Sequence, residues 1–218
     1  MYHCQMKTIS RSYGRSSTAA AAYRCGAVIQ CQTYGMTHDY KRKSGVIMSE
    51  VVGTNLDRQS LWNNAEQSEM NKNGSLKEKA TVARELEVSL PYEASATDQI
   101  DAVRSMADHL VEKYGVAVDW ALHEPSKEGD QRNIHAHIMF TTRIIEDDKI
   151  GKKTRILDDR TTGRTELDNI KSKWAEITQE IAIDKSKWDH RSNRDRGIHQ
   201  EATKHMGVGA INYERRTG

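Results

Sequence analysis

Alternating apolar and polar positions predict several β-strands in this chain, and the clearest one covers residues 133–142. This stretch is rich in apolar and β-branched residues and contains neither Gly nor Pro. Because successive side chains of a strand point to opposite faces, His135 and His137 share one face. The other face is apolar, with Ile134, Ala136, Ile138 and Phe140. We therefore expect a strand that buries one face and presents two imidazoles on the other.

Similar patterns predict the remaining elements. Strands are expected over residues 2–9, 46–52, 81–90 and 116–123. A helical period, with capping Ser, Thr or Asp residues and glycine stops, predicts helices over residues 19–25, 58–71 and 97–114, and another one around 170–181. Residues 27–45 and 143–166 are polar and show no clear period, so we expect irregular loops there.

The order of these elements predicts one α+β domain over residues 1–218. Strand 116–123 is followed by a polar loop and then by strand 133–142, so the two are expected to pair antiparallel. Helices are interspersed between the strands. We expect an antiparallel sheet with helices on one face.

The composition is that of a folded, polar protein, with 36% hydrophobic and 29% charged residues. No apolar run approaches the roughly 20 residues that a membrane span needs, and the N-terminus lacks the apolar core of a signal peptide. Cys4, Cys25 and Cys31 are odd in number and have no recognisable spacing. These features favour a reducing cytoplasmic location.

The charge is distributed unevenly along the chain. Residues 1–45 contain seven Lys or Arg residues and a single acid, Asp39, whereas residues 46–115 contain seven bases and twelve acids. A basic N-terminal segment is what a polyanion-binding face requires. An ordinary charged surface in contact with solvent explains the same pattern, unless specific functional residues are found in this segment.

Three histidines are the strongest indication of chemistry. His123 lies in the strand expected to pair with His135 and His137, which would bring three imidazoles together. Such a set can hold a divalent cation and leave coordination positions open. Asp119 has the same parity as His123 and is a candidate for orienting an imidazole. The alternative is that surface strands simply carry histidines. Three histidines on the same face of two adjacent strands favour a metal site, and the pattern does not decide between Mn, Mg, Zn, Ni and Co.

Tyr23 is the first candidate nucleophile, with Tyr13 and Tyr40 as its rivals. It ends a short Ala-rich helix within the most basic segment of the chain. A tyrosine hydroxyl has a pKa near ~10 and needs a polarised electrophile or a nearby base to react. The residue pattern alone leaves the choice among these tyrosines open.

Short motifs along the chain resemble the MobA/MobL family, the MobQ class of plasmid mobilisation relaxases. They occur at residues 2–4, 9–12, 14–16, 19–24, 38–40, 61–63, 83–88, 90–91, 133–143, 190–192 and 205–207. The resemblance covers nearly the whole chain, and the motifs are specific in combination and in order. Two positions depart from the family pattern: Ile134 stands where many relatives have Pro, and residues 201–204 are a diverged version of the usual run.

The resemblance implies an HUH-endonuclease fold, with an antiparallel sheet and flanking helices, in which His135 and His137 form the His-hydrophobic-His motif and His123 is the third metal ligand. It also implies that Tyr23 is the nucleophile. The implied reaction is cleavage of one strand of single-stranded or hairpin DNA at the nic site of a transfer origin, with a 5′-phosphotyrosyl link and a free 3′-hydroxyl. Relaxosome accessory proteins and a type IV coupling protein are the implied partners.

Two other functions fit part of this pattern. A rolling-circle replication initiator is also an HUH nuclease, but its tyrosine usually follows the histidine motif, whereas Tyr23 precedes His135. A metal-stabilised DNA-binding module without catalysis is the second alternative. Since relatives often continue into helicase or primase regions, residues 1–218 are also expected to form the N-terminal part of a longer protein.

Further residues receive roles from this interpretation. Glu85 and Glu87, on one strand face, are candidates for accepting the Tyr23 proton or for steering an imidazole. Tyr40 is a candidate for stacking on a base. Basic residues are candidates for neutralising DNA phosphates: Arg15, Lys41, Arg42, Lys43, Lys152, Lys153 and Arg155.

Overall fold

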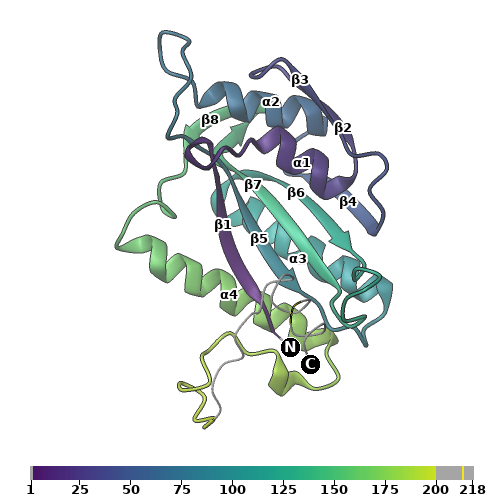
Figure 1. Cartoon of the computed structure of the whole chain (residues 1–218). Coiled ribbons are helices and arrows are strands. Elements are labelled where there is room, and N and C mark those ends of the chain that lie inside the picture. The colour runs from purple at the N-terminus through teal and green to yellow at the C-terminus, as the bar shows by residue number, and fades with distance from the viewer. Residues whose placement is uncertain (1, 200–212, 214–218) are drawn as a thin grey trace.

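The main sheet of the protein is antiparallel and has six strands in a computed structural model that describes residues 2–199 and 213. Its order is β1-β5-β7-β6-β4, with β8 paired to β7 (Figure 1). The bounds are β1 Cys4–Ser10, β4 Val46–Val52, β5 Thr81–Ser89, β6 Val116–His123, β7 His135–Glu146 and β8 Lys149–Lys153. The predicted antiparallel pairing of β6 with β7 is confirmed.

The described residues also form four α-helices and two short 3₁₀ helices. They are α1 Ser17–Cys25, α2 Arg58–Ser68, α3 Ala96–Tyr114, α4 Thr162–Ile181, η1 Arg11–Tyr13 and η2 Lys185–Lys187. Local signals define the predicted helix ends. The Ser16 and Ser95 side chains accept hydrogen bonds from the first turns of α1 and α3, and Gly26 and Gly115 end these helices in the left-handed conformation.

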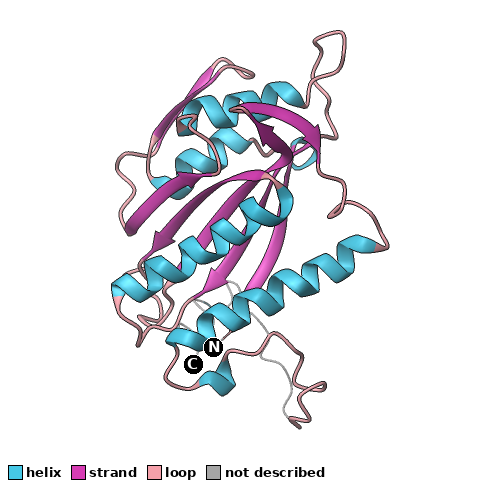
Figure 2. Ribbon diagram, turned by 180° about the vertical axis from the view of Figure 1, so that it is seen from behind, coloured by secondary structure: helices cyan, strands magenta, loops and turns pink. Residues whose placement is uncertain are grey.

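Helices cover both faces of the sheet, so the expectation of helices on one face is wrong. On one face two long helices, α3 and α4, cover the sheet (Figure 2). They pack over the large apolar side chains of β5, β6 and β7, including Leu86, Trp120 and Phe140. On the other face α1 and α2 pack over Ala83 and Met139 near one end of the strands. Several residues of this second core are alanines, such as Ala83 and Ala117, and these give a weaker hydrophobic pattern than the large residues of the first core, which explains the error.

The two segments expected to be irregular contain hairpins instead. Residues 27–45 hold β2 (Val28–Cys31) and β3 (Met36–Asp39), which form a separate antiparallel pair. Residues 143–166 hold the end of β7, the strand β8 and the start of α4. Asp147 and Asp148 both have positive φ and form a two-residue hairpin turn between β7 and β8. These short, polar strands carry too little periodicity to be recognised.

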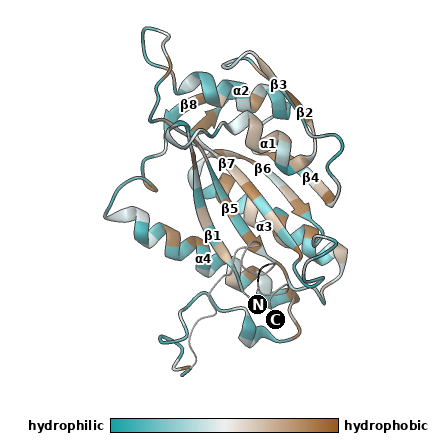
Figure 3. Cartoon of the chain, in the orientation of Figure 1, coloured by the Kyte–Doolittle hydropathy of each residue, from teal (hydrophilic) through white to brown (hydrophobic). Residues whose placement is uncertain are grey.

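Hydrophobic residues concentrate along the central strands, whereas the loop between α2 and β5 is largely hydrophilic (Figure 3). In the described part of the chain no helix combines the length and the apolar character needed to cross a membrane. The motif at residues 205–207 lies outside the described residues.

Candidate metal centre and nucleophile

Three histidines converge where β6 and β7 pair. His123 stands directly opposite His135, and His137 shares their face of the sheet. The ring centroids lie 5.3 Å apart for His123 and His135, 5.1 Å for His123 and His137, and 5.5 Å for His135 and His137. One nitrogen of each imidazole lies within 4.8 Å of the others. The predicted cluster is therefore formed by strand register alone.

Each imidazole is held through one ring nitrogen. His123 Nε2 donates to the main-chain oxygen of Arg24 at 2.7 Å, His135 Nδ1 contacts the main-chain oxygen of Asn133 at 3.0 Å, and His137 Nδ1 contacts a carboxylate oxygen of Glu85 at 2.8 Å. The second nitrogen of each ring is left to act as a ligand. Such anchoring fixes the orientation of metal-binding histidines.

Burial, supported by the nearby charge of Lys43, lowers the pKa of His123 to about 3, and burial also lowers the pKa of His135. These rings are therefore neutral at physiological pH, which is the form that coordinates a metal. Three imidazoles with a nitrogen each to offer fit a divalent transition-type ion.

Glu85 is the acid that reaches this cluster. It is buried on β5, the strand next to β7, and its carboxylate accepts hydrogen bonds from His137 and from Arg24 at 2.6 Å and 3.2 Å. Burial alone would raise the pKa of Glu85, but these hydrogen bonds outweigh burial and lower the pKa to about 2. Glu87, on the same face, forms an ion pair with Lys7 instead. The sequence alone does not distinguish Glu85 from Glu87, but in the folded protein Glu85 contacts the histidine cluster and Glu87 contacts Lys7.

Asp119 makes contacts other than the predicted one. Its carboxylate accepts hydrogen bonds from Arg58 at 2.9 Å and 3.0 Å and from the Trp62 indole at 2.8 Å. Asp119 and His123 do lie on the same face of β6. They are four residues apart, a distance of roughly 13 Å along the strand, which is beyond the reach of a short carboxylate. Asp119 therefore fastens α2 to the sheet rather than orienting an imidazole.

Tyr23 lies in the last turn of α1, with 45% of its side chain exposed. Tyr23, Arg24 and Glu85 line one cleft of about 370 Å³, together with Lys7 and Arg15. Since Arg24 also contacts His123 and Glu85, the helix end that carries Tyr23 is docked on the histidine cluster.

Tyr40, Lys43 and Arg24, whose guanidinium lies 5.3 Å from the ring centroid, contact the ring of Tyr23. The ring of Tyr40 packs edge-on at a centroid distance of 5.2 Å. Lys43 Nζ lies 4.0 Å from the ring centroid and donates to the main-chain oxygen of Tyr23 at 2.7 Å. The rival Tyr13 is exposed in η1 and does not line the cleft of Tyr23. Of the three tyrosines, Tyr23 best combines exposure with a place in the cleft.

The predicted DNA-binding residues fall into two groups. Arg15 lines the Tyr23 cleft, and Lys43 lies beside the Tyr23 ring. Lys41 and Arg42 are exposed just before Lys43. Lys152, Lys153 and Arg155 lie on or just after β8, which pairs with the far end of β7. Arg143 lies six residues after His137 along β7, a separation of roughly 20 Å, so this second group is remote from the histidines. Lys153 forms an ion pair with Glu69.

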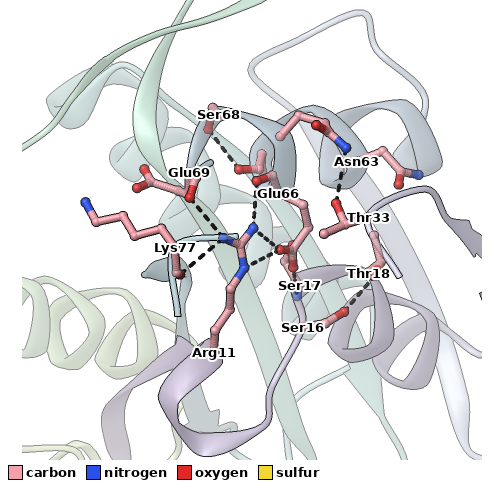
Figure 4. A network of polar contacts seen from close by, with 12 residues as sticks. Arg11, Ser16, Ser17, Thr18, Thr33, Asn63, Glu66, Ser68, Glu69 and Lys77 are labelled. Carbon is pink, nitrogen blue, oxygen red and sulfur yellow. Dashed lines mark hydrogen bonds and ion pairs between the residues drawn. The ribbon is translucent and has the colours of Figure 1, made fainter. Parts of the chain in front are cut away.

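A buried ion pair between Arg11 and Glu66 supports α1 from its other end (Figure 4). Arg11 donates to the Glu66 carboxylate at 2.8 Å and 3.2 Å, and to the main-chain oxygens of Glu66 and Glu69. The second carboxylate oxygen of Glu66 accepts from the main-chain nitrogen and the hydroxyl of Ser17. Sequence reasoning missed this network, because the only signal was Arg11 within the 9–12 motif and nothing indicated its partner.

A sequence profile of the MobA/MobL family matches residues 15–216. The chain belongs to the MobA/MobL family. The mobilization protein MobL of Acidithiobacillus ferridurans is 37% identical over 251 residues, an alignment that covers 100% of this MobA/MobL chain and 65% of the relative. The conjugal transfer protein TraA of Rhizobium radiobacter is 30% identical over 250 residues. That alignment covers 98% of this chain and 22% of TraA. This chain thus spans less than two thirds of the length of either relative.

Solved structures share the fold of this MobA/MobL chain. One comes from work on vancomycin resistance transfer in Staphylococcus aureus, with a TM-score of 0.68, 23% identity and coverage of 93% of this chain and 97% of that one. Another is the Mn-bound MobM relaxase domain in complex with oriT DNA of plasmid pMV158. Its TM-score is 0.51 and its sequence identity 11%, and the match covers 97% of this chain and 98% of the MobM domain. The expected HUH-endonuclease-like sheet with flanking helices is confirmed.

Proposed function

We propose that this chain is a DNA relaxase domain that nicks one strand at the nic site of a transfer origin and later reseals it. The observation that carries the proposal is the docking of the Tyr23 helix end on the three-histidine cluster through Arg24. Membership of the MobA/MobL family and the fold shared with a relaxase domain support it.

Tyr23 is the proposed nucleophile. Its phenolic oxygen loses its proton and attacks the scissile phosphorus, the bond from phosphorus to the 3′ oxygen breaks, and that oxygen takes up a proton. The products are a 5′-phosphotyrosyl DNA and a free 3′-hydroxyl. Because the new phosphodiester replaces the old one, attack by a 3′-hydroxyl reverses the step without ATP.

His123, His135 and His137 would hold the metal. A bound divalent cation would supply positive charge next to a non-bridging phosphate oxygen, where negative charge develops. Mn²⁺ is present in the MobM relaxase domain, and this chain offers a donor set that fits such an ion.

Glu85 is assigned to orienting His137 and Arg24, because both of its partners favour its ionised form. A carboxylate with so low a pKa is a weak acceptor for the Tyr23 proton. Glu87 remains the other acid predicted to serve the site. Arg15, which lines the Tyr23 cleft, and Lys43, which lies beside the Tyr23 ring, would neutralise backbone phosphates near Tyr23.

The proposal extends to the setting of the reaction. The substrate would be single-stranded or hairpin oriT DNA in the bacterial cytoplasm, and relaxosome accessory proteins and a type IV coupling protein would be its partners. Residues 1–218 would form the relaxase domain of a longer protein. The short coverage of MobL and TraA supports this last point.

The test is covalent capture of DNA. The protein is incubated with Mn²⁺ and a random-sequence pool of single-stranded oligonucleotides, and strands that survive denaturing gel electrophoresis with the protein are sequenced. We expect an adduct for the wild type, for Tyr40→Phe and for Tyr13→Phe, and none for Tyr23→Phe or in EDTA. An adduct with Tyr23→Phe would refute the nucleophile assignment, and a protein that binds strands without any adduct would be a non-catalytic module.

A rolling-circle initiator would give the same kind of adduct, so the captured sequence separates the two nucleases. A relaxase is expected to select a site that, cloned into a plasmid, permits mobilisation of that plasmid. An initiator site would instead support plasmid replication. The order of Tyr23 before His135 favours the first outcome.

A further inference from the structure

A second groove, of about 540 Å³, lies beside the Tyr23 cleft, and its size is typical of ligand-binding sites, which enclose roughly 300–1,000 Å³. Tyr34, Met36 and His38 come from the β2–β3 hairpin and the turn within it. Leu76 comes from the loop between α2 and β5, and Arg15 from the loop before α1. We call it the hairpin groove. None of its residues belongs to the histidine cluster.

The hairpin groove adjoins the Tyr23 cleft. The two share Gly14, Arg15, Ser16 and Ala19 at the start of α1. A chain-like ligand with one unit at Tyr23 can therefore place a neighbouring unit in the hairpin groove. Arg15 stands between the two positions and offers a positive charge to the link.

Three side chains give the hairpin groove an apolar wall. Tyr34 is 38% exposed and Met36 52% exposed, and the exposed Leu76 lies near them. Tyr34 lies near the guanidinium of Arg11, which Glu66 fixes. The exposed part of the Tyr34 ring suits a flat ligand that can stack on it.

His38 adds a polar group without a partner. Its Nε2 atom is buried and makes no hydrogen bond to any described residue. A buried imidazole nitrogen without a partner is costly. The hairpin groove thus combines apolar side chains with polar ones, among them Ser12, His38 and Glu78, and with the adjacent cation Arg15.

We propose that the hairpin groove binds a nucleobase of the strand whose phosphate Tyr23 attacks, with the base against Tyr34 and Met36 and the backbone at Arg15. This inference rests on the proposed relaxase function and adds a base-binding subsite to it. A base supplies the flat face and the polar edge that the groove calls for, and its phosphate supplies the charge. An apolar protein segment would match Met36 and Leu76 but would leave His38 and Arg15 unused.

Photocrosslinking tests the location directly. Tyr23→Phe protein, which cannot cleave, is mixed with a random-sequence single-stranded pool that contains 5-iododeoxyuridine, then irradiated, digested and analysed by mass spectrometry. We expect crosslinks at Tyr34, Met36 or His38, which fragment spectra distinguish from Tyr40 on the same tryptic peptide. Crosslinks that fall only elsewhere would overturn the inference.

Binding measurements give the second test, again in Tyr23→Phe protein with a fluorescein-labelled single-stranded pool. Since stacking on one aromatic side chain contributes a large share of the binding of one base, Tyr34→Ala is expected to weaken binding about tenfold, and Tyr34→Phe to restore most of the loss. Ile183→Ala, which removes an apolar side chain that is 82% exposed, is the matched control and should bind as the parent does. Thermal melting checks that each variant is folded.

The outcomes separate this inference from the function on which it rests. If wild-type protein forms the covalent adduct while Tyr34→Ala binds as tightly as the parent, the subsite is refuted and the relaxase function stands. If crosslinks map to the hairpin and no adduct ever forms, the subsite stands and the nuclease function fails. Unchanged DNA binding by Tyr34→Ala and Met36→Ala together would leave the groove to a protein partner and refute the inference.

Discussion

The Nε2 atom of His123 donates a hydrogen bond to the main-chain oxygen of Arg24 at 2.7 Å. Arg24 follows Tyr23 in the chain, so this bond joins the helix end that carries the proposed nucleophile to a strand that carries a proposed metal ligand. The Arg24 side chain reinforces the link by contacting Glu85, which holds His137. Placement of Tyr23 relative to the histidines is therefore built into the fold rather than left to the DNA.

Loss of one histidine should abolish metal binding. His137→Ala removes one of three ligands, and two imidazoles on a sheet hold a divalent ion far more weakly than three. We expect calorimetry to show one Mn²⁺ site in the wild type and none in His137→Ala. His190→Ala, in the segment after η2, is the matched control, and loss of Mn²⁺ binding in that variant would contradict the site assignment.

Glu85→Gln should weaken metal binding without removing a ligand. Replacement of a carboxylate that orients a ligating histidine typically lowers metal affinity about 10–100-fold. Glu87→Gln, whose carboxylate pairs with Lys7, should have a much smaller effect. The measurement is Mn²⁺ titration of both variants, and equal losses in the two would show that Glu85 has no special role.

The lowered pKa of Glu85 also predicts acid sensitivity of the metal-free fold. In the folded chain this carboxyl binds its proton at a pKa of about 2, whereas its ordinary pKa is 4.5. Between these values the unfolded chain binds more protons than the folded chain. Ionised Glu85 therefore contributes fully to the free energy of unfolding above pH 4.5, and this contribution is lost as the pH falls toward 2. The shift corresponds to roughly 3 kcal/mol.

Urea unfolding of wild type and Glu85→Gln at about pH 6 and about pH 3 checks this prediction. The difference in unfolding free energy between the two proteins should shrink at the lower pH. A difference that stays constant would show that Glu85 does not titrate as described.

Asp119→Asn should affect stability and leave metal affinity unchanged. The variant weakens the contacts with Arg58 and Trp62 in a buried position, and we expect a loss of roughly 1–3 kcal/mol in unfolding free energy. Asp101→Asn, at an exposed position of α3, is the control. A drop in Mn²⁺ affinity for Asp119→Asn would restore the role that the sequence first predicted for this residue.

Glu66→Ala should destabilise the protein strongly. It leaves the buried guanidinium of Arg11 without its carboxylate and also removes the acceptor for Ser17 at the start of α1. Breaking a buried ion pair in this way costs roughly 3–5 kcal/mol. Glu176→Ala breaks an exposed pair with Lys173 and should change the unfolding free energy by less than about 1 kcal/mol. Similar values for the two variants would contradict a supporting role for Glu66.

Local sequence determined much of this protein. The period-two pattern placed His135 and His137 on one face of a strand, and the helical stripe and the glycine stop at Gly115 defined α3. Short motifs indicated the family, and with it Tyr23. These features depend on residues close together in the chain, where backbone geometry and capping act directly.

Tertiary structure decided which of these features meet. Backbone hydrogen bonds between strands are the same for any side chain, so alternation fixes the face of a residue but not the neighbouring strand. Glu85 therefore became the partner of His137 only when β5 paired with β7, and Asp119 was placed out of reach of the imidazoles. The Arg11–Glu66 pair joins residues 55 positions apart, and packing in three dimensions alone selects it.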